Sequence, residues 1–414
     1  MSVPDGFKVS EVGVIPVDWE AVLLDSVAKR GSGHTPDKKH SEYWNGNIKW
    51  ISLKDSNRFD QIYIYDTTEK ITMAGIANSS AVLHPSESVV LSRDAGVGKS
   101  AITKDVMAVS QHFFAWQCGL QLDNHFLYYW FQFKKSEFER IAIGTTIKTI
   151  GIPYFQKLKI PLPPLTEQKA IAQSLSDVDN LITAIDKLIT KKRNIKQGTI
   201  QELLTGKKRL PGFSGEWEVK KLGDIGKFKK GKNLPKKSIT QDGQPCVLYG
   251  EIYTKYNYYS KVLYSRISYD LAKESIEINT GDILFAGSGE TFEEIGKCFA
   301  YLGIEKAYAG GDIIILSPNK DDSYFLSYLL NSYQANVQKS NLGQGSSVIH
   351  IYTINLKNIE IPIPPLPEQK AIAKILTEMD EEIEALEKKR EKYKNIKQGM
   401  MQELLTGKTR IIDN

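Results

Sequence analysis

The segment RDAGVGKS at residues 93–100 contains the glycine and lysine types that bind nucleotide phosphates in some loops. A phosphate-binding loop needs glycine where Arg93 stands, and no helix of the required kind is expected to follow it. The six histidines include no pair at zinc-ligand spacing with a third partner. The three cysteines are too few and too widely spaced for a disulfide framework or a zinc site. We therefore expect neither a nucleotide site nor a metal site.

Motifs of DNA-modifying enzymes are missing as well. The chain contains no Asn-Pro-Pro-aromatic or Asp-Pro-Pro-aromatic tetrapeptide of amino-methyltransferases, and no Pro-Asp followed at useful spacing by the acidic-x-Lys triplet of nucleases. The sequence therefore predicts a protein that is not an enzyme and has no catalytic residues. His112, after Ser110 and Gln111, is expected to be a DNA contact or a core histidine and not a catalytic base.

The bulk composition limits the class of protein. A chain of 414 residues is too long for one hydrophobic core, so two or more domains are expected. Contents of 41% hydrophobic and 25% charged residues are those of a soluble globular protein. No stretch approaches the roughly 18 apolar residues of a membrane span, and residues 1–19 lack the pattern of a secretory signal. A cytoplasmic location without a membrane partner is the simplest expectation.

The net charge of +5 permits nucleic-acid binding without demanding it. Lysines are concentrated between residues 220 and 237, where Asp224 alone opposes them. This segment is either part of a nucleic-acid contact or a solvated surface.

An internal repeat organises the chain. IPLPPLTEQKAIA at residue 160 returns as IPIPPLPEQKAIA at residue 361, an offset of 201 residues, and NIKQG and QELLTGK return at the same offset. The bodies that precede these tails, residues 20–143 and 219–344, share little. A duplication that keeps its tail and varies its body indicates a common scaffold with two different binding surfaces.

Each kept tail is predicted to be a long helix. The double prolines at 163–164 and 364–365 suit the turn that enters a helix, and an acidic residue follows in each first turn, where the helix dipole favours it. Apolar residues then alternate at spacings of four and three, as in a coiled-coil seam. The predicted seam comprises Ile171, Leu175, Val178, Ile182, Ile185 and Ile189, and Ile372, Leu376, Met379, Ile383 and Leu386. The alternative is that each helix packs only on its own domain.

Charges predict that the two helices pair antiparallel. In both helices the first half is acidic and the second half is basic, so parallel pairing would set like charges together. Alternatively, these charges only solubilise the helices. Gly198 and Gly399 occupy the same repeat position inside the helices, where glycine costs about 1 kcal/mol relative to alanine. We expect them to mark a close backbone approach or a kink.

The variable bodies are expected to mix α and β structure. Strands are predicted at 48–53, 62–65, 88–91, 245–249, 282–286 and 312–316, and helices at 126–141 and 324–338. The predicted fold class is α+β: two mixed α/β domains separated by two long helices that form an antiparallel coiled coil, with an internal pseudo-two-fold repeat. The expected segments are 1–160 for domain 1, 161–207 for the central helix, 208–361 for domain 2 and 362–410 for the C-terminal helix.

These features resemble the specificity subunits of type I restriction–modification systems. Residues 161–172, their copy at 362–373 and residues 203–213 resemble the constant regions of those subunits, and residues 13–19 resemble their N-terminal segment. The resemblance covers the whole chain in architecture. It implies that domains 1 and 2 are target recognition domains, each of which reads one half of a bipartite, asymmetric DNA site, and that the helices fix the unread gap.

The resemblance also implies the partners of the chain. They are double-stranded DNA, two adenine methyltransferase subunits that bind along the helices and bodies, and ATP-driven translocating endonuclease subunits that join through them. S-adenosylmethionine, ATP and magnesium belong to those partners, so this chain is expected to hold no cofactor. The rival interpretation is a repressor that dimerises through the coiled coil. The divergent bodies argue against it, because a homodimer obtains two sites from one body.

Candidate DNA contacts are side chains with polar tips on predicted loops and strand ends. Residues 249–266 interleave tyrosine and lysine, which suits contacts to phosphate and sugar, although an aromatic strand pair would give the same pattern. Residues 91–102 and 284–297 place glycine and serine after a strand, where a loop can approach a groove closely. The candidates are Lys54, Arg93, Lys99, Gln111, His112 and Lys148 in domain 1, and Tyr249, Tyr253, Lys255, Ser288, Lys297 and His350 in domain 2.

Overall fold

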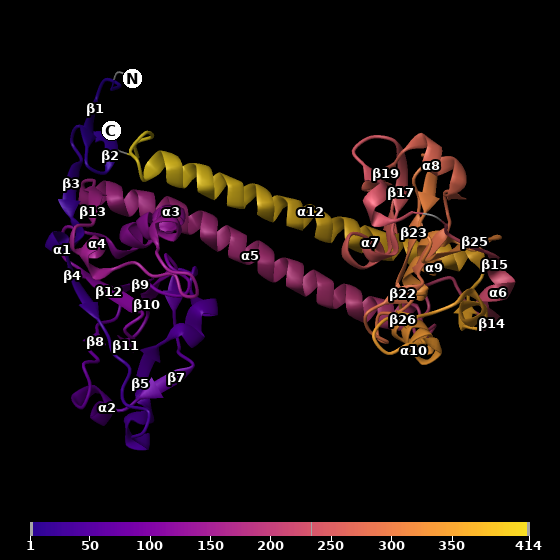
Figure 1. Ribbon diagram of the computed structural model, residues 1–414, viewed down its shortest axis with the longest axis horizontal. Coiled ribbons are helices and arrows are strands. Elements are labelled where there is room, and N and C mark those ends of the chain that lie inside the picture. Colours follow the sequence, from indigo (N-terminus) through magenta and orange to yellow (C-terminus); the bar gives the residue numbers. More distant parts are fainter. Residues whose placement is uncertain (1–2, 233, 412–414) are drawn as a thin grey trace. The chain divides into compact units, whose positions relative to one another are not determined.

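Two compact units make up the computed structural model, which describes residues 3–232 and 234–411. Unit 1 comprises residues 1–186 and 389–414, and unit 2 comprises residues 187–388. Each unit combines a body of sheets and short helices with parts of two long helices (Figure 1). The four segments expected from the sequence are consecutive stretches of the chain, and they stay a prediction. The two units, in contrast, are defined by which residues pack together.

The two long helices are α5 (Leu165–Leu203) and α12 (Leu366–Leu404), each of 39 residues. Both begin directly after a double proline, as predicted. Residues of α5 up to Asp186 belong to unit 1 and the later ones to unit 2, while α12 begins in unit 2 and enters unit 1 at Lys389. Each unit therefore contains the first part of one helix and the last part of the other.

Ion pairs show that the helix parts run antiparallel within each unit, as their charges predict. The pairs are Lys397–Asp179 at 2.7 Å and Arg390–Asp186 at 3.0 Å in unit 1, and Lys192–Glu382 at 2.7 Å, Lys196–Asp380 and Arg193–Glu387 in unit 2. In every pair, a residue from the last part of one helix contacts a residue from the first part of the other helix. The basic halves thus lie against the acidic halves.

The predicted seam residues are buried or half-buried, and the first of them also pack on the bodies. In unit 1, Ile171 and Leu175 join the core that contains Trp19, and in unit 2, Ile372 and Leu376 join the corresponding core. The last turn of the other helix and the residue after it enter the same two cores. These residues are Met401, Leu404 and Leu405 in unit 1 and Ile200, Leu203 and Leu204 in unit 2. Pairing between helices and packing on the bodies therefore occur together.

Gly198 and Gly399 do not mark a close approach. A Cβ atom built at either position would meet no heavy atom of the described residues outside the local helix within 4 Å. The expectation of a close backbone approach is therefore wrong, because both glycines lie at exposed positions of their helices.

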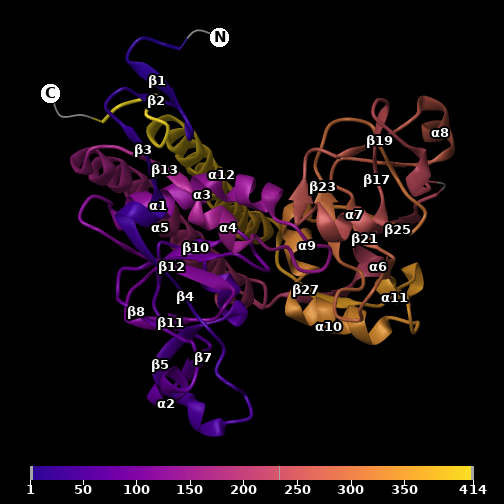
Figure 2. The same cartoon turned by 60° about the vertical axis from the view of Figure 1, so that its left-hand side comes forward.

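Body 1 contains two sheets joined by short connections. The five-stranded sheet has the order β4 (Ala28–Ser32), β12 (Phe113–Cys118), β9 (Val89–Ser92), β10 (Ser100–Thr103) and β6 (Tyr63–Ile64). The four-stranded sheet has the order β7 (Glu69–Ile71), β5 (Trp44–Ile51), β11 (Met107–Val109) and β8 (Leu83–His84). Helix α3 (Asn124–Ile141) buries Phe126 and Phe131 against Trp116 and Leu91 of the first sheet. The second sheet and α2 (Met73–Ala77) lie at the end of the body away from the helices of unit 1 (Figure 2).

Body 2 repeats this plan. One sheet has the order β15 (Gly226–Lys230), β25 (Ile313–Pro318), β21 (Ile283–Ala286), β23 (Cys298–Tyr301) and β18 (Tyr259–Ser260). The other has the order β16 (Ile239–Thr240), β19 (Ser265–Ile267), β17 (Gln244–Val247), β24 (Ala307–Ala309) and β20 (Ile276–Ile278). Two-stranded ribbons connect each body to the start of its long helix: β3 (Glu20–Leu23) with β13 (Lys159–Leu162), and β14 (Glu218–Lys221) with β27 (Glu360–Ile363). The mixed α/β fold class is confirmed.

Two local predictions in body 2 are wrong. The helix predicted over 324–338 is two helices, α9 (Ser323–Leu329) and α10 (Tyr333–Leu342). The chain breaks between them because the Asn331 amide donates to the carbonyl of Cys298 at 2.7 Å, while the Ser332 hydroxyl caps α10. The strand predicted to reach Tyr249 ends at Val247, and Tyr249 instead begins α7 (Tyr249–Thr254).

Candidate nucleic-acid interface

Four predicted DNA contacts of body 1 come together on three loops. Arg93 follows β9, Gln111 and His112 lie between β11 and β12, and Lys148 precedes α4 (Ile152–Gln156). Backbone hydrogen bonds hold the loops: the Arg93 amide donates to the His112 carbonyl at 2.9 Å, and the Ile150 amide donates to the Arg93 carbonyl at 3.0 Å. The strand order brings the loops together, because β9 and β12 are neighbours.

A carboxylate connects the side chains of this cluster. Asp94 Oδ2 lies 2.9 Å from His112 Nδ1, and the hydroxyl of Thr149 donates to Asp94 Oδ1. Gln111 accepts a hydrogen bond from Thr35 through Oε1 at 2.7 Å. Asp94, Thr149 and Thr35 were not among the residues predicted from the sequence. Asp94 could have been noticed as an acidic residue beside Arg93. Its partners His112 and Thr149, however, lie on other loops, so the sequence does not reveal the cluster.

Arg93 is held by an aromatic ring. Its guanidinium carbon lies 5.4 Å from the centre of the Phe114 ring, and its Nε is buried without a hydrogen-bond partner among the described residues. Nε also lies 3.7 Å from Asp94 Oδ1, an ion pair that is longer than a hydrogen bond. A buried donor without a partner is costly, so Nε of Arg93 is an unsatisfied donor within this cluster.

Body 2 carries the same backbone frame. The Gly287 amide donates to the Asp312 carbonyl at 2.7 Å, and the Ile351 amide donates to the Gly287 carbonyl at 3.0 Å. By these bonds, Gly287 takes the place of Arg93, and Asp312 takes the place of His112. The residues that follow and precede them also correspond: Ser288 to Asp94, Gly311 to Gln111 and His350 to Thr149. The two bodies thus present different side chains on one frame.

The predicted contacts Ser288, His350 and Tyr253 meet in this part of body 2. Ser288 Oγ lies 2.9 Å from His350 Nδ1, where strands β22 (Ser288–Gly289) and β26 (Ile349–His350) pair. The Tyr253 hydroxyl donates to the Ser288 carbonyl at 3.1 Å, and burial raises the pKa of Tyr253. His350 and Asp312 line a cavity of about 270 Å³.

The side chains of Lys99 and Lys297 donate hydrogen bonds to backbone carbonyls of their own bodies. Lys99 Nζ donates to the Ser56 carbonyl at 2.9 Å, and Lys297 Nζ donates to the Tyr253 carbonyl at 3.2 Å. The two lysines occupy equivalent positions. The backbone carbonyl of each accepts a hydrogen bond from the amide of the last residue of a central strand: Ser92 of β9 for Lys99, and Ala286 of β21 for Lys297. Burial lowers the pKa of Lys297. Both lysines therefore anchor a loop to a short helix, which leaves them less free to reach a phosphate than their types suggested.

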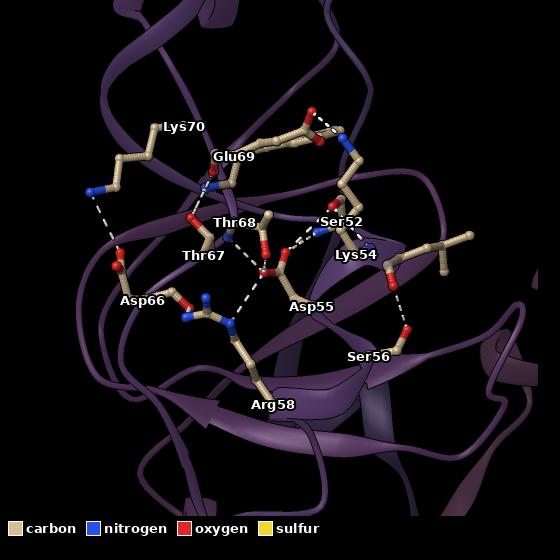
Figure 3. A network of polar contacts seen from close by, with 12 residues as sticks. Ser52, Lys54, Asp55, Ser56, Arg58, Asp66, Thr67, Thr68, Glu69 and Lys70 are labelled. Atoms are coloured by element: carbon tan, nitrogen blue, oxygen red, sulfur yellow. Dashed lines mark hydrogen bonds and ion pairs between the residues drawn. The ribbon is translucent and has the colours of Figure 1, made fainter. Parts of the chain in front are cut away.

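Lys54 lies on the short helix η2 (Leu53–Arg58), which a buried carboxylate fixes (Figure 3). Asp55 accepts hydrogen bonds from the amide of Ser52 at 3.0 Å and from the amide and hydroxyl of Thr68, each at 2.7 Å. Lys54 pairs with Glu69 at 2.8 Å, and its side chain is largely exposed. The candidate therefore sits on a rigid element at the surface.

Tyr249 begins the corresponding helix α7 of body 2, and Lys255 directly follows its end. Glu251 plays the part of Asp55 there, accepting from the amide of Leu248 at 3.0 Å and from the hydroxyl of Ser265 at 2.6 Å. Lys255 pairs with Glu251 at 2.6 Å, and Tyr249 is exposed. Both candidates line a cavity of about 1010 Å³. The segment 249–266 does not form an aromatic strand pair, because β18 and β19 belong to different sheets.

Two equivalent polar clusters fix the helices to the bodies. In unit 1, Asp179 accepts from the Tyr129 hydroxyl at 2.9 Å and pairs with Lys397. In unit 2, Asp380 accepts from the Tyr328 hydroxyl at 2.5 Å and pairs with Lys196. Burial raises the pKa of Tyr129 and of Tyr328 and lowers that of Lys196. Each lysine comes from the last part of the helix that began in the other body, so the clusters join three segments.

A second pair of clusters closes the start of each long helix. In unit 1, Glu167 accepts from Trp19 Nε1 at 3.0 Å and from two nitrogens of Arg410 at 2.7 and 2.8 Å. In unit 2, Glu368 accepts from Trp217 Nε1 at 3.2 Å and from two nitrogens of Arg209, each at 2.6 Å. Arg209 and Arg410 follow the ends of α5 and α12.

The residues described here contain neither a group of three His, Cys, Asp or Glu side chains placed to hold a metal ion nor a helix apolar and long enough to cross a membrane.

Comparison with known proteins identifies the class. The family model of the type I restriction modification DNA specificity domain matches residues 16–197 and again residues 214–395. The chain therefore belongs to the family of type I restriction–modification specificity subunits, and this prediction from the sequence is confirmed. Its two matched domains each contain one body and most of the helix that follows it.

Relatives of full length support the same assignment. The chain is 28% identical over 409 residues to the type I restriction enzyme MjaVIII specificity subunit of Methanocaldococcus jannaschii, covering 96% of this chain and 94% of that protein. It is 26% identical over 429 residues to the MjaIX specificity subunit of the same organism, covering 98% and 96%. The fold is similar to that of the type I restriction–modification S subunit from M. genitalium, with a TM-score of 0.60, 17% identity and 98% coverage of both chains.

Proposed function

We propose that the chain reads a bipartite, asymmetric DNA site, with each body reading one half. The observation that carries this proposal is the matched pair of backbone frames. Arg93, Asp94, Gln111 and His112 stand on one frame where Gly287, Ser288, Gly311 and Asp312 stand on the other. Two equal frames place side chains in the same way toward DNA, and different side chains read different base edges.

The chemistry of the two sets suits different bases. The guanidinium of Arg93 can donate two hydrogen bonds to the two acceptors of guanine in the major groove. In body 2, Gly287 stands in the place of Arg93, and the carboxylate of Asp312, in the place of His112, can accept from the amino group of cytosine. Lys148, which is exposed beside Arg93, suits a phosphate and would supply affinity without sequence preference.

In this proposal the helices α5 and α12 set the spacing between the two half-sites and dock the methyltransferase subunits. Adenine methyltransferase subunits supply S-adenosylmethionine, and an ATP-dependent translocating endonuclease joins through them with ATP and magnesium. The chain itself contributes base recognition and positioning, and neither methylates nor cleaves DNA. The full-length likeness to specificity subunits of type I restriction enzymes supports these roles.

Exchange of one body tests the proposal. Residues 20–143 are replaced by the corresponding body of a relative, and the chimera is expressed with the methyltransferase subunits. Single-molecule sequencing of methylated adenines should show that one half-site changes while the other half-site and the gap stay the same. Replacement of residues 219–344 is the matched control and should change the opposite half-site. A change in both half-sites after one exchange would contradict independent reading by the two bodies.

A further inference from the structure

We propose that Asp94 is a positioning residue that sets the base preference of body 1 at one position, by fixing His112 and Gln111 as a pair that recognises adenine. The inference rests on the proposed function, since it requires body 1 to read a half-site. It adds the base and the atoms that read it.

The first step is the tautomer of His112. Its Nδ1 lies 2.9 Å from Oδ2 of Asp94, and an ionised carboxylate only accepts hydrogen bonds. Nδ1 must therefore carry the proton, which leaves Nε2 of a neutral ring as an acceptor. Asp94 is itself fixed, because its side chain is only 13% exposed and the Thr149 hydroxyl donates to its other oxygen.

The second step is the orientation of Gln111. Its Oε1 accepts from the Thr35 hydroxyl at 2.7 Å, so its Nε2 points the other way and lies 3.3 Å from Nε2 of His112. The amide nitrogen can only donate. It therefore faces an acceptor, which agrees with the neutral tautomer; a proton on Nε2 of His112 would set donor against donor.

Gln111 and His112 together present a defined set of hydrogen-bonding groups to a ligand. Gln111 is exposed and the His112 side chain is 29% exposed, so an amide donor and an imidazole acceptor stand side by side at the surface. The single lone pair of His112 Nε2 accepts from Gln111 over 3.3 Å in the free chain. On binding, this bond is exchanged: the ligand donates to His112 Nε2, and the Gln111 amide donates to the ligand. Adenine shows an acceptor, N7, beside a donor, the N6 amino group, in the major groove, whereas guanine shows two acceptors. The pair complements adenine. The corresponding residues of body 2, Gly311 and Asp312, lack such a pair.

Asp94→Asn is the decisive variant, because the neighbours of Oδ1 predict how the new amide lies. Arg93 Nε, which can only donate, lies 3.7 Å from Oδ1, so the amide oxygen of Asn takes that place and still accepts from the Thr149 hydroxyl. The NH2 group then turns toward Nδ1 of His112. Nδ1 then becomes the acceptor and Nε2 becomes a donor. A donor at Nε2 opposes the amino group of adenine and suits an acceptor of guanine. The substitution preserves the size of the side chain, so folding should be unaffected.

The experiment selects bound duplexes from a library with randomised half-sites, using the purified complex of the full chain with its methyltransferase subunits. Binding is measured instead of methylation, so that a change of the target adenine does not confuse the result. For Asp94→Asn we expect the preference for adenine over guanine at one position of one half-site to fall roughly 5- to 150-fold. Gln111→Ala should weaken the preference at the same position. Ser288→Ala, at the equivalent place in body 2, should leave every base preference of the half-site read by body 1 unchanged.

The outcomes separate the inference from the proposed function. If the unaltered complex selects no bipartite site, the proposed function fails. If it selects one, and Asp94→Asn leaves every base preference unchanged or weakens all positions equally, Asp94 is only a structural residue and the inference is overturned. The inference also fails if the altered position does not prefer adenine in the unaltered complex.

Discussion

Replacement of Arg410 by methionine should loosen the end of α12 from body 1. Arg410 makes two hydrogen bonds to Glu167 and two to Asp18, at 2.9 and 2.7 Å. The Glu167 side chain is only 4% exposed, so the variant leaves a buried carboxylate with Trp19 Nε1 as its remaining named donor. Breaking a buried ion pair costs about 3–5 kcal/mol. Because Arg410 is 24% exposed and partly screened by water, we expect about 2–3 kcal/mol.

Native-state hydrogen exchange measures this loss where it occurs. Amides in the last turns of α12 and the first turns of α5 should lose protection in Arg410→Met, while Lys408→Met, at an exposed neighbouring position, should change protection little. The double variant Arg410→Met/Glu167→Gln should regain about 1–2 kcal/mol, since glutamine removes the unpaired buried charge and still accepts from Trp19. Unchanged protection in Arg410→Met, or lower protection in the double variant than in the single one, would refute this reasoning.

The same contact has a pH dependence with a defined sign. The hydrogen bond from Arg410 holds the pKa of the Asp18 carboxyl below its ordinary value. A lowered pKa in the folded state gives a stabilisation that is complete above the ordinary pKa of about 3.9 and is lost as the pH falls through the folded value. The difference in protection between the unaltered chain and Arg410→Met should therefore shrink below about pH 4.

Two further perturbations give independent tests. Lys339 is fully buried and donates to the carbonyls of Gly296 and Leu330, each at 2.8 Å, and burial lowers its pKa to about 8. Between about pH 8 and the ordinary lysine pKa of about 10.4, the unfolded state binds more protons than the folded state. Urea denaturation should therefore show that the free energy of unfolding rises over this pH range in the unaltered chain but not in Lys339→Met. An equal pH dependence of the two unfolding free energies would contradict the lowered pKa. Insertion of four residues near Thr190 should lengthen α5 by about 6 Å, close to two base-pair steps, and methylome sequencing should show the same half-sites with a longer gap. An unchanged gap with retained activity would mean that the helices dock partners and do not measure distance.

The sequence predicted the parts of the fold that depend on local pattern. The double prolines and the spacing of apolar residues located both long helices, and the acidic and basic halves predicted their antiparallel direction, which Lys397–Asp179 and its counterparts confirm. Strands such as β9 and β21 were found because each is a short apolar run between turn residues. In these cases the signal lies within one segment or between two copies of it.

The sequence could not predict features that depend on contacts between distant segments. Asn331 ends α9 by bonding to Cys298 of β23, and no pattern within residues 324–338 reveals that partner. The cluster around Asp94 has the same character. It requires β9 and β12 to be neighbours and Thr149 to return beside them, and those pairings are set by packing of the whole body. Base-reading candidates could be selected by type, but their geometry could not.

The division of the helices between the units also bears on the order in which the chain can fold. The core of unit 1 contains Met401, Leu404 and Leu405, and its closing ion pairs come from Arg410. These residues are synthesised after all of residues 187–388, which form unit 2. Unit 2 is built from that one continuous stretch, and the part of α5 that it needs, including Ile200, Leu203 and Leu204, lies within it. Because domains fold as their residues emerge, body 1 must wait with part of its apolar surface uncovered while unit 2 is completed. The dense aromatic packing of α3 on its sheet, centred on Phe131 and Trp116, is the part of body 1 that can form without the last helix.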